Sequence, residues 1–434
     1  MKTILRISFI VFAAVVTTGM FIIIFQRPEP AKAAAVKGCV FRTVFGEESS
    51  ADMYLFNTPE KVATSIENAL HYVVEAQQEN GGWGAGSHAA QNIMDPHAVK
   101  TDPATTSMVL MAILRSGSTL SDGEYSEQLR DGLNYLLREV ERSDKNSNNI
   151  TSLTGTQIQT KLGANIDVVL TSQFFSNVLD FIYDKQMKGR VKDALQVCVN
   201  KIQNTQTANG SFSGNGWAGV LQSSFASSAL EAAKDQGVKV DAKVLEKSQN
   251  YQKGNYDTKT GNVNTDMGAG VVLYSVSSSV RNTSVDAKKV KEDLKEAKKQ
   301  GKIERLNEEE VSVETLRDLG YSEADAEKYS TAYNVYNAAK VTAQQEKVMN
   351  GFGNNGGEEF LSFLQTGESM IINKDTGWKD WYENVSGKLV SIQNGDGSWN
   401  GHHCITSPVF CTATSLLILS VNNDVEKLMK VGDK

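Results

Sequence analysis

The sequence predicts an all-α protein built from repeated pairs of helices. A short motif, in which Gln is followed by Gly four residues later and by an aromatic residue two positions after that, occurs three times in the 434 residues. The stretches around each copy carry apolar residues at the spacing of amphipathic helices. No comparable stretch shows the sustained two-residue alternation of a half-buried strand, so strands should be few.

The motif copies mark the predicted repeat units. A degenerate copy is expected to begin at Gln252, and the spacing of the copies is compatible with a unit of about 45 residues in which some copies have lost the motif. The complete copies are Gln77, Gly81 and Trp83; Gln206, Gly210 and Phe212; and Gln393, Gly397 and Trp399.

A helix is predicted on each side of the first copy. Thr58 and Pro59 supply an N-cap and a first-turn proline for the helix before it, and a second helix starts near Asp102 and Pro103. The predicted buried faces are Val62, Ile66, Ala69, Leu70, Val73 and Val74 in the first helix, and Met108, Met111 and Ala112 in the second.

The third copy repeats this arrangement. Leu389 and Ile392 form the end of the apolar face before it, and Ser407 and Pro408 start the helix after it. The apolar face of that last helix consists of Ala413, Leu416, Leu417 and Leu419.

Helix pairs of this kind cannot bury an apolar face alone, so they must stack on their neighbours. A Gln amide can satisfy backbone groups at a neighbouring helix end, Gly leaves room for close approach, and the aromatic ring packs against the adjoining unit. The motif residues are therefore expected to be structural.

The segments "QQENGGWG", "QTANGSFSG" and "QNGDGSWNG" resemble the repeat signature of squalene and oxidosqualene cyclases, which protein prenyltransferases share more loosely. The resemblance covers Pro59 to Val421 with interruptions and implies an α/α toroid, with helix pairs in two concentric layers around a central cavity. No Asp-x-Asp-Asp run is present to protonate an alkene, and only 8% of residues are aromatic. Cyclase activity is therefore not expected, and prenylation, which uses a second helical subunit in the cytoplasm, fits poorly.

The chain divides into segments of different character. Between Asp286 and Glu310 charges of both signs alternate, which indicates a solvated helical insertion; its alternative role is a lid or partner-docking arm. A short helix, a stop at Gly320 and a new N-cap at Ser322 follow. The predicted segments are 1–35 as signal or anchor, 36–57 as linker, 58–284 and 350–423 as toroid repeats, 285–349 as insertion and 424–434 as tail.

The N-terminal segment predicts export. Lys2 and Arg6 precede an uncharged run from Ile7 to Phe25, long enough for a membrane anchor, while the alanines at 31–35 suit signal-peptide cleavage. Both alternatives, a membrane-anchored and a secreted protein, place the remainder outside the cytoplasm. The formal charge of −7, without a basic stripe, excludes nucleic acid as an expected partner.

The densest group of candidate site residues is His402, His403, Cys404 and Cys411. These side chains are of the type that bind zinc, and His403 with Cys404 offers an imidazole and a thiol for nucleophilic catalysis. The structural alternative makes Cys411 a core residue, Cys404 its oxidised partner or a free thiol, and both histidines loop residues.

His88 and His97 lie in the loop of the first motif, near Asp95 and Asp102. If the toroid closes, loops of the first and last units become neighbours, so these histidines could join the C-terminal group. In the structural alternative, both histidines are polar loop residues that bind no ligand.

Asp167 and Asp266 lie at the edges of apolar or Gly-rich segments, where a buried carboxyl could act as a general acid. Helix capping is the structural alternative for both.

The sequence therefore leads to two principal functional hypotheses. The first is a scaffold that binds a ligand or an extracytoplasmic protein without cyclase activity. The second is a metal- or thiol-dependent enzyme that uses the His402 to Cys411 group. A carbohydrate-active enzyme is a weaker third, because no paired carboxylates stand out.

Overall fold

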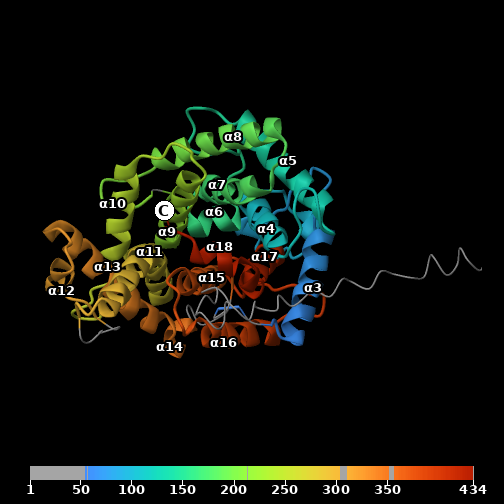
Figure 1. Ribbon diagram of the computed structural model, residues 1–434. Coiled ribbons are helices and arrows are strands. Elements are labelled where there is room, and N and C mark those ends of the chain that lie inside the picture. Colours follow the sequence, from blue (N-terminus) through green and yellow to red (C-terminus); the bar gives the residue numbers. More distant parts are fainter. Residues whose placement is uncertain (1–53, 56, 213, 304–309, 351–355, 434) are drawn as a thin grey trace, which may run out of the picture. The chain divides into compact units, whose positions relative to one another are not determined.

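The computed structural model describes residues 54–55, 57–212, 214–303, 310–350 and 356–433 (Figure 1). These residues form α-helices, short 3-10 helices and loops, and they contain isolated β-bridges but no strand. The prediction of an all-α protein is confirmed. The predicted signal or anchor lies outside the described residues, and none of the helices described combines the length and the apolar character that spanning a bilayer requires.

One set of helices, here called the inner helices, is buried on most faces. Each contacts the next along the chain, and the last contacts the first, so the series of contacts closes on itself. Every residue of the last one, Pro408–Leu419, is buried. The inner helices are α4 (Pro103–Arg115), α7 (Ile166–Val178), α9 (Gly219–Asp235), α11 (Val272–Lys299), α15 (Gly357–Ile372) and α17 (Pro408–Leu419).

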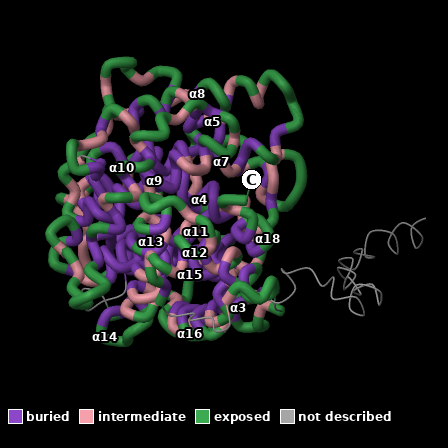
Figure 2. Tube along the Cα trace, turned by 60° about the vertical axis from the view of Figure 1, so that its left-hand side comes forward, coloured by how far each residue is buried: buried purple, intermediate pink, exposed green. Residues whose placement is uncertain are grey.

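A second set, the outer helices, packs against the inner ones and keeps an exposed face (Figure 2). The first and last outer helices, α3 and α16, contact each other, so the outer layer also joins the two ends of this unit. The outer helices are α3 (Glu60–Glu75), α5 (Ser126–Arg142), α8 (Lys185–Gln203), α10 (Ala242–Lys253), α13 (Glu323–Ala343) and α16 (Trp378–Ser391). Each alternates along the chain with an inner helix (Figure 1).

The motif copies occupy equivalent turns between an outer and an inner helix. In each copy the Gln amide donates to the carbonyl of the Gly in the same copy and to a backbone carbonyl of the next outer helix. The second carbonyls belong to Gln128 in α5, Val244 in α10 and Ser65 in α3. The third copy thus bonds the last unit to the first.

The other motif positions are equally constrained. The glycines have φ values of 85°, 93° and 88°, and a Cβ atom there would lie 2.6, 2.2 or 2.5 Å from a backbone oxygen of the next outer helix. The aromatic residues are buried, and their backbone amides donate to Thr106, Ser223 and Thr412 of the following inner helix. The structural role predicted for the motif fits these contacts.

Details of the predicted units differ in the structure. Helix α3 begins after Pro59, which occupies the N-cap position without a side-chain cap, so the prediction of Thr58 as N-cap is wrong. Ile392 is 41% exposed because it follows the end of α16. Asp102 does cap α4, since its carboxylate accepts a hydrogen bond from the Thr105 amide at 2.7 Å.

The degenerate motif copy begins later than expected. The Gln252 amide donates to the Val220 carbonyl at 3.3 Å instead of forming a turn. The turn follows at Asp257, and an isolated bridge between Tyr256 and Val263 takes the place of the bridge between Gln206 and Phe212. One extra residue in this loop displaces the pattern that the sequence shows in the complete copies.

The predicted insertion is integrated into the helical layers. Helix α11 continues through residue 285, and α13 packs along it. Between them lies the short helix α12 (Val313–Asp318), followed by Gly320 at a φ of 96° and by the N-cap Ser322, as predicted. A further short helix, α14 (Glu346–Met349), follows α13.

Candidate functional site

The C-terminal loop does not assemble the predicted cluster. His402 is exposed, His403 and Cys404 are half-buried, and Cys411 is fully buried in α17. The two histidine rings contact edge to face, with centroids 5.6 Å apart. The Cys411 thiol donates to the Ile405 carbonyl at 3.5 Å, and both cysteines are free thiols.

Neither chemistry predicted for this loop gains support from its geometry. Among the residues that the structure describes, no group of three or more His, Cys, Asp or Glu side chains could hold a metal ion. Burial and the nearby Glu358 raise the pKa of Cys404, and Lys161 only partly opposes them. A raised pKa disfavours the thiolate that nucleophilic attack requires.

The loops of the first and last units do meet. The Gln91 amide lies 2.5 Å from the His88 ring and donates to the Cys404 carbonyl at 2.9 Å. Thr406 in turn donates to the Gln91 carbonyl at 2.7 Å. His97 does not share this arrangement; its backbone amide is capped by the carboxylate of Asp95.

The two aspartates considered as acids have different environments. Asp167 is fully buried and accepts hydrogen bonds from the Ala104 amide at 3.1 Å and the Gln159 side chain at 2.7 Å. Burial and the neighbouring Asp102 charge raise the pKa of Asp167. By accepting the hydrogen bond from the Ala104 amide, Asp167 joins α7 to the start of α4. Asp266 is exposed, so the expectation of a buried carboxyl there is wrong.

A cavity of about 190 Å³ lies among the inner helices and receives side chains from every one of them. Polar and apolar residues line it in similar numbers. Among the polar ones, Arg115 belongs to α4, Glu231 to α9, Arg281 to α11 and Gln365 to α15, and the segment after α17 forms a further part of the wall. Apolar lining residues include Met108, Met111, Phe181, Phe225, Leu364 and Leu417.

One charged group of the cavity wall is fully paired. The Arg115 guanidinium donates to Glu368 at 2.6 Å, to Asp424 at 2.6 Å and to the Leu417 carbonyl at 2.9 Å. Its side chain is 8% exposed. These contacts join α4, α15 and α17 to the C-terminal segment, and they leave the charge of Arg115 matched by two carboxylates.

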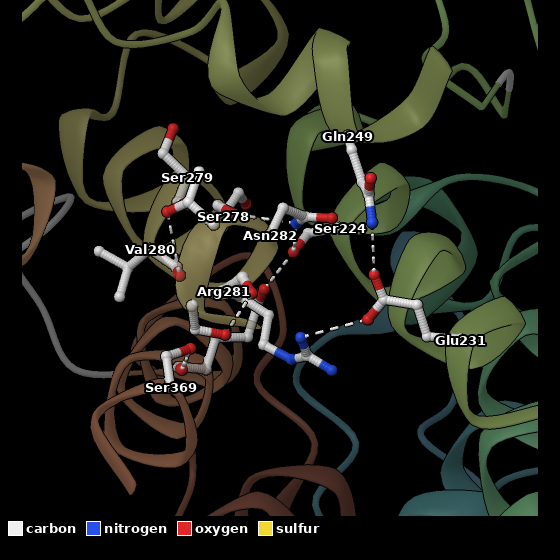
Figure 3. A network of polar contacts seen from close by, with 12 residues as sticks. Ser224, Glu231, Gln249, Ser278, Ser279, Val280, Arg281, Asn282 and Ser369 are labelled. Atoms are coloured by element: carbon white, nitrogen blue, oxygen red, sulfur yellow. Dashed lines mark hydrogen bonds and ion pairs between the residues drawn. The ribbon is translucent and has the colours of Figure 1, made fainter. Parts of the chain in front are cut away.

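A second arginine on the wall is only partly paired. Arg281 of α11 contacts the Glu231 carboxylate of α9 at 3.4 Å, and the Gln249 amide donates to the other oxygen of Glu231 at 3.2 Å (Figure 3). Among the described residues Glu231 is the single side chain within ion-pair distance of the Arg281 guanidinium, although the Arg281 charge also acts on Asp235, where it opposes the rise of the pKa that burial causes. Burial raises the pKa of Glu231, although the Arg281 charge opposes this.

A buried amide also faces the cavity. Gln365 of α15 is 2% exposed, its carbonyl oxygen accepts a hydrogen bond from Ser224, and its Nε2 group has no partner within the described residues. Ser224 itself accepts from the Asn282 amide at 2.8 Å, which also donates to the Ser278 carbonyl (Figure 3). This network orients the Gln365 amide.

The residues after α17 form part of the cavity wall. They include η5 (Val421–Asp424) and α18 (Val425–Met429), which packs on α15. The Lys288 ammonium of α11 donates to the Met429 carbonyl at 2.6 Å and to the Val431 carbonyl at 3.2 Å, and it pairs with Asp433. Residues 424–433 of the predicted tail therefore pack against the helices, with Val425, Leu428 and Met429 buried.

None of the cavity residues Arg115, Glu231, Arg281 and Gln365 is predicted from the sequence. A usable signal was present, because Arg115 ends an apolar helix and Arg281 interrupts a stretch of small and apolar residues. The adjacent Glu358 and Glu359 at the start of α15 are also 3% exposed, and burial with the Glu359 charge raises the pKa of Glu358 to about 8.

In comparisons with known proteins, no family model matches the chain, and no significant match was found among curated proteins or solved structures.

Proposed function

We propose that the chain forms an exported α/α toroid whose central cavity binds a small molecule, without cyclase activity. The closed series of contacts among the inner helices supports the toroid, as do the equivalent bonds of the Gln-Gly-aromatic turns. Export rests on the apolar run from Ile7 to Phe25, which lies outside the described residues.

The observation that carries ligand binding is the lining of the cavity. Partly paired Arg281 and the unpartnered amide of Gln365 come from two helices and line the same pocket. Buried polar groups are normally hydrogen-bonded, and an exception calls for an explanation such as a ligand site. A pocket with a few convergent polar groups among apolar side chains is the usual form of a small-molecule site.

The volume limits the size of the ligand. A cavity of about 150 Å³ holds a benzene molecule, so 190 Å³ suits a ligand of roughly six to ten non-hydrogen atoms. A thirty-carbon polyene is far too large for this space. The size of the cavity and the missing Asp-x-Asp-Asp run both argue against triterpene cyclisation.

A fragment-binding experiment tests the proposal. Benzyl alcohol, benzamide, benzoate and benzylamine would be titrated into the purified protein and followed by ligand-observed NMR. We expect binding of at least one probe that is abolished in Ser228→Trp, because that side chain would fill the cavity from α9. Lys234→Trp, on the exposed face of the same helix, is the matched control. Binding that survives Ser228→Trp unchanged, or no binding of any probe, would refute the cavity as the site.

A further inference from the structure

We infer that the ligand of the central cavity is a small carboxylate, held by Arg281 and the side-chain amide of Gln365. This inference rests on the proposed function and specifies its ligand class. It depends on which hydrogen-bonding groups on the wall remain available once their partners within the protein are counted.

Arg115 is excluded as the anchor because each of its three guanidinium nitrogens already donates a hydrogen bond. Two carboxylates and one backbone carbonyl surround its guanidinium at 2.6 to 2.9 Å. A ligand that competed for Arg115 would have to break contacts that join α4 to the C-terminal segment. This arginine therefore serves the structure.

Arg281, in contrast to Arg115, has donors that no described residue takes up. A guanidinium carries five N–H donors in a planar fork that matches a carboxylate. Glu231 takes one of these donors at 3.4 Å, a longer contact than either ion pair of Arg115. In Figure 3 no dashed line reaches the other terminal nitrogen of Arg281. The Arg281 side chain is 11% exposed and lines the cavity, so its remaining donors are accessible from within it.

Gln365 adds a further N–H donor to the wall, and it comes from a second helix, α15. Its oxygen is occupied by Ser224, so the group left without a partner is the Nε2 donor. Donors on two helices suit a ligand with acceptor oxygens, and a carboxylate supplies two of them together with the charge that Arg281 recognises. Apolar neighbours such as Phe225 and Met111 then contact the remainder of the ligand.

Glu231 is the natural competitor of such a ligand. Its carboxylate occupies part of the Arg281 fork, and burial raises its pKa, which favours the neutral form that competes less. The Gln249 amide holds Glu231 at its other oxygen. Removal of the Glu231 charge should therefore strengthen carboxylate binding, which a purely structural ion pair would not do.

The test compares benzoate with benzamide, a neutral molecule of nearly the same shape, by titration calorimetry of the full chain at constant pH and salt. We expect benzoate to bind about tenfold more tightly than benzamide. Arg281→Met should reduce benzoate affinity to that of benzamide, while Glu231→Gln should raise it about three- to tenfold. Far-ultraviolet circular dichroism and thermal melts check that each variant is folded.

The outcomes separate this inference from the proposed function. Equal affinities for the two probes, or a Glu231→Gln variant that binds benzoate no better, would overturn the carboxylate assignment even if Arg281→Met fails to fold. If benzamide or benzyl alcohol still binds and Ser228→Trp abolishes that binding, the cavity remains a ligand site of another class. If no probe binds, both proposals fail.

Discussion

Replacing Gln393 with Ala tests whether the last motif turn joins the two ends of the helical unit. Its amide donates to the Gly397 carbonyl at 2.8 Å and to the Ser65 carbonyl at 2.9 Å, and the Ser65 hydroxyl donates to its oxygen at 2.7 Å. Each such bond contributes about 1 kcal/mol net, so the three together should contribute about 3 kcal/mol to the free energy of unfolding. Ser65 is 3% exposed and would lose its acceptor without full access to water.

Urea unfolding of the purified protein, followed by circular dichroism, measures this loss. Gln300→Ala is the matched control, because Gln300 is exposed at the end of α11 and its side chain donates to Glu296 at 2.9 Å and to no other described residue. We expect the control to change the free energy of unfolding by less than about 0.5 kcal/mol. A Gln393→Ala variant that loses no more than the control would refute the inference that this turn closes the array.

Three further outcomes are expected. Gly397→Ala should lower the free energy of unfolding by about 2 kcal/mol or more, because the added Cβ would lie 2.5 Å from a backbone oxygen of α3. Gly387→Ala inside α16, where an added Cβ would meet no atom within 4 Å, should raise it by about 0.5 to 1 kcal/mol. Equal effects would contradict the argument from close approach at Gly397. The folded pKa of Glu358, about 8, lies above the ordinary 4.5, so protonation of Glu358 stabilises the fold fully below the unfolded pKa. This stabilisation, at most about 5 kcal/mol, is lost as the pH rises through 8. The free energy of unfolding in urea should therefore decline less between pH 5 and 8 in Glu358→Gln than in the unaltered protein, and parallel curves would contradict this. Lys288→Met should speed amide hydrogen exchange in residues 421–433 about tenfold, since three acceptors lose their donor, and unchanged exchange there would show that Lys288 does not hold the segment.

The fold could be predicted to the extent that it is encoded locally. The Gln206 to Phe212 turn has contacts within its own loop and to the helix that follows, so its sequence pattern is visible, while its bond to Val244 of α10 cannot be read from that pattern. The degenerate turn after α10 was misplaced because Tyr256 replaces the Gln and one residue is added. The sequence predicts a solvated insertion over 285–349 because charges of both signs alternate between Asp286 and Glu310, but the outer helix α13 in that segment packs along α11 with a buried face.

The candidate site could not be predicted in this way because its residues are far apart in the sequence. Arg115 pairs with Glu368 and Asp424, which lie 253 and 309 positions away. The His402 to Cys411 group is predicted from closeness in sequence, yet Cys411 is buried in α17 and the described residues contain no group of three or more His, Cys, Asp or Glu side chains that could hold a metal ion. Proximity along the chain was a poor guide where the site consists of one or two residues from each helix.

The Glu231 and Arg281 pair is poorly explained as a device for stability. Taking two charges out of water costs several kcal/mol per ion, and replacing such a pair with apolar side chains of similar volume is often neutral or stabilising. We therefore expect the double variant Glu231→Met with Arg281→Met to unfold in urea at the same or a higher midpoint than the unaltered protein, while Arg281→Met alone unfolds earlier because Glu231 is left without its partner. The double variant should also lose the preference for benzoate over benzamide. If the double variant is instead much less stable than the unaltered protein, the pair is structural, and the small side chains around it, such as Ser224 and Ser228, leave space for those two charges and not for a ligand.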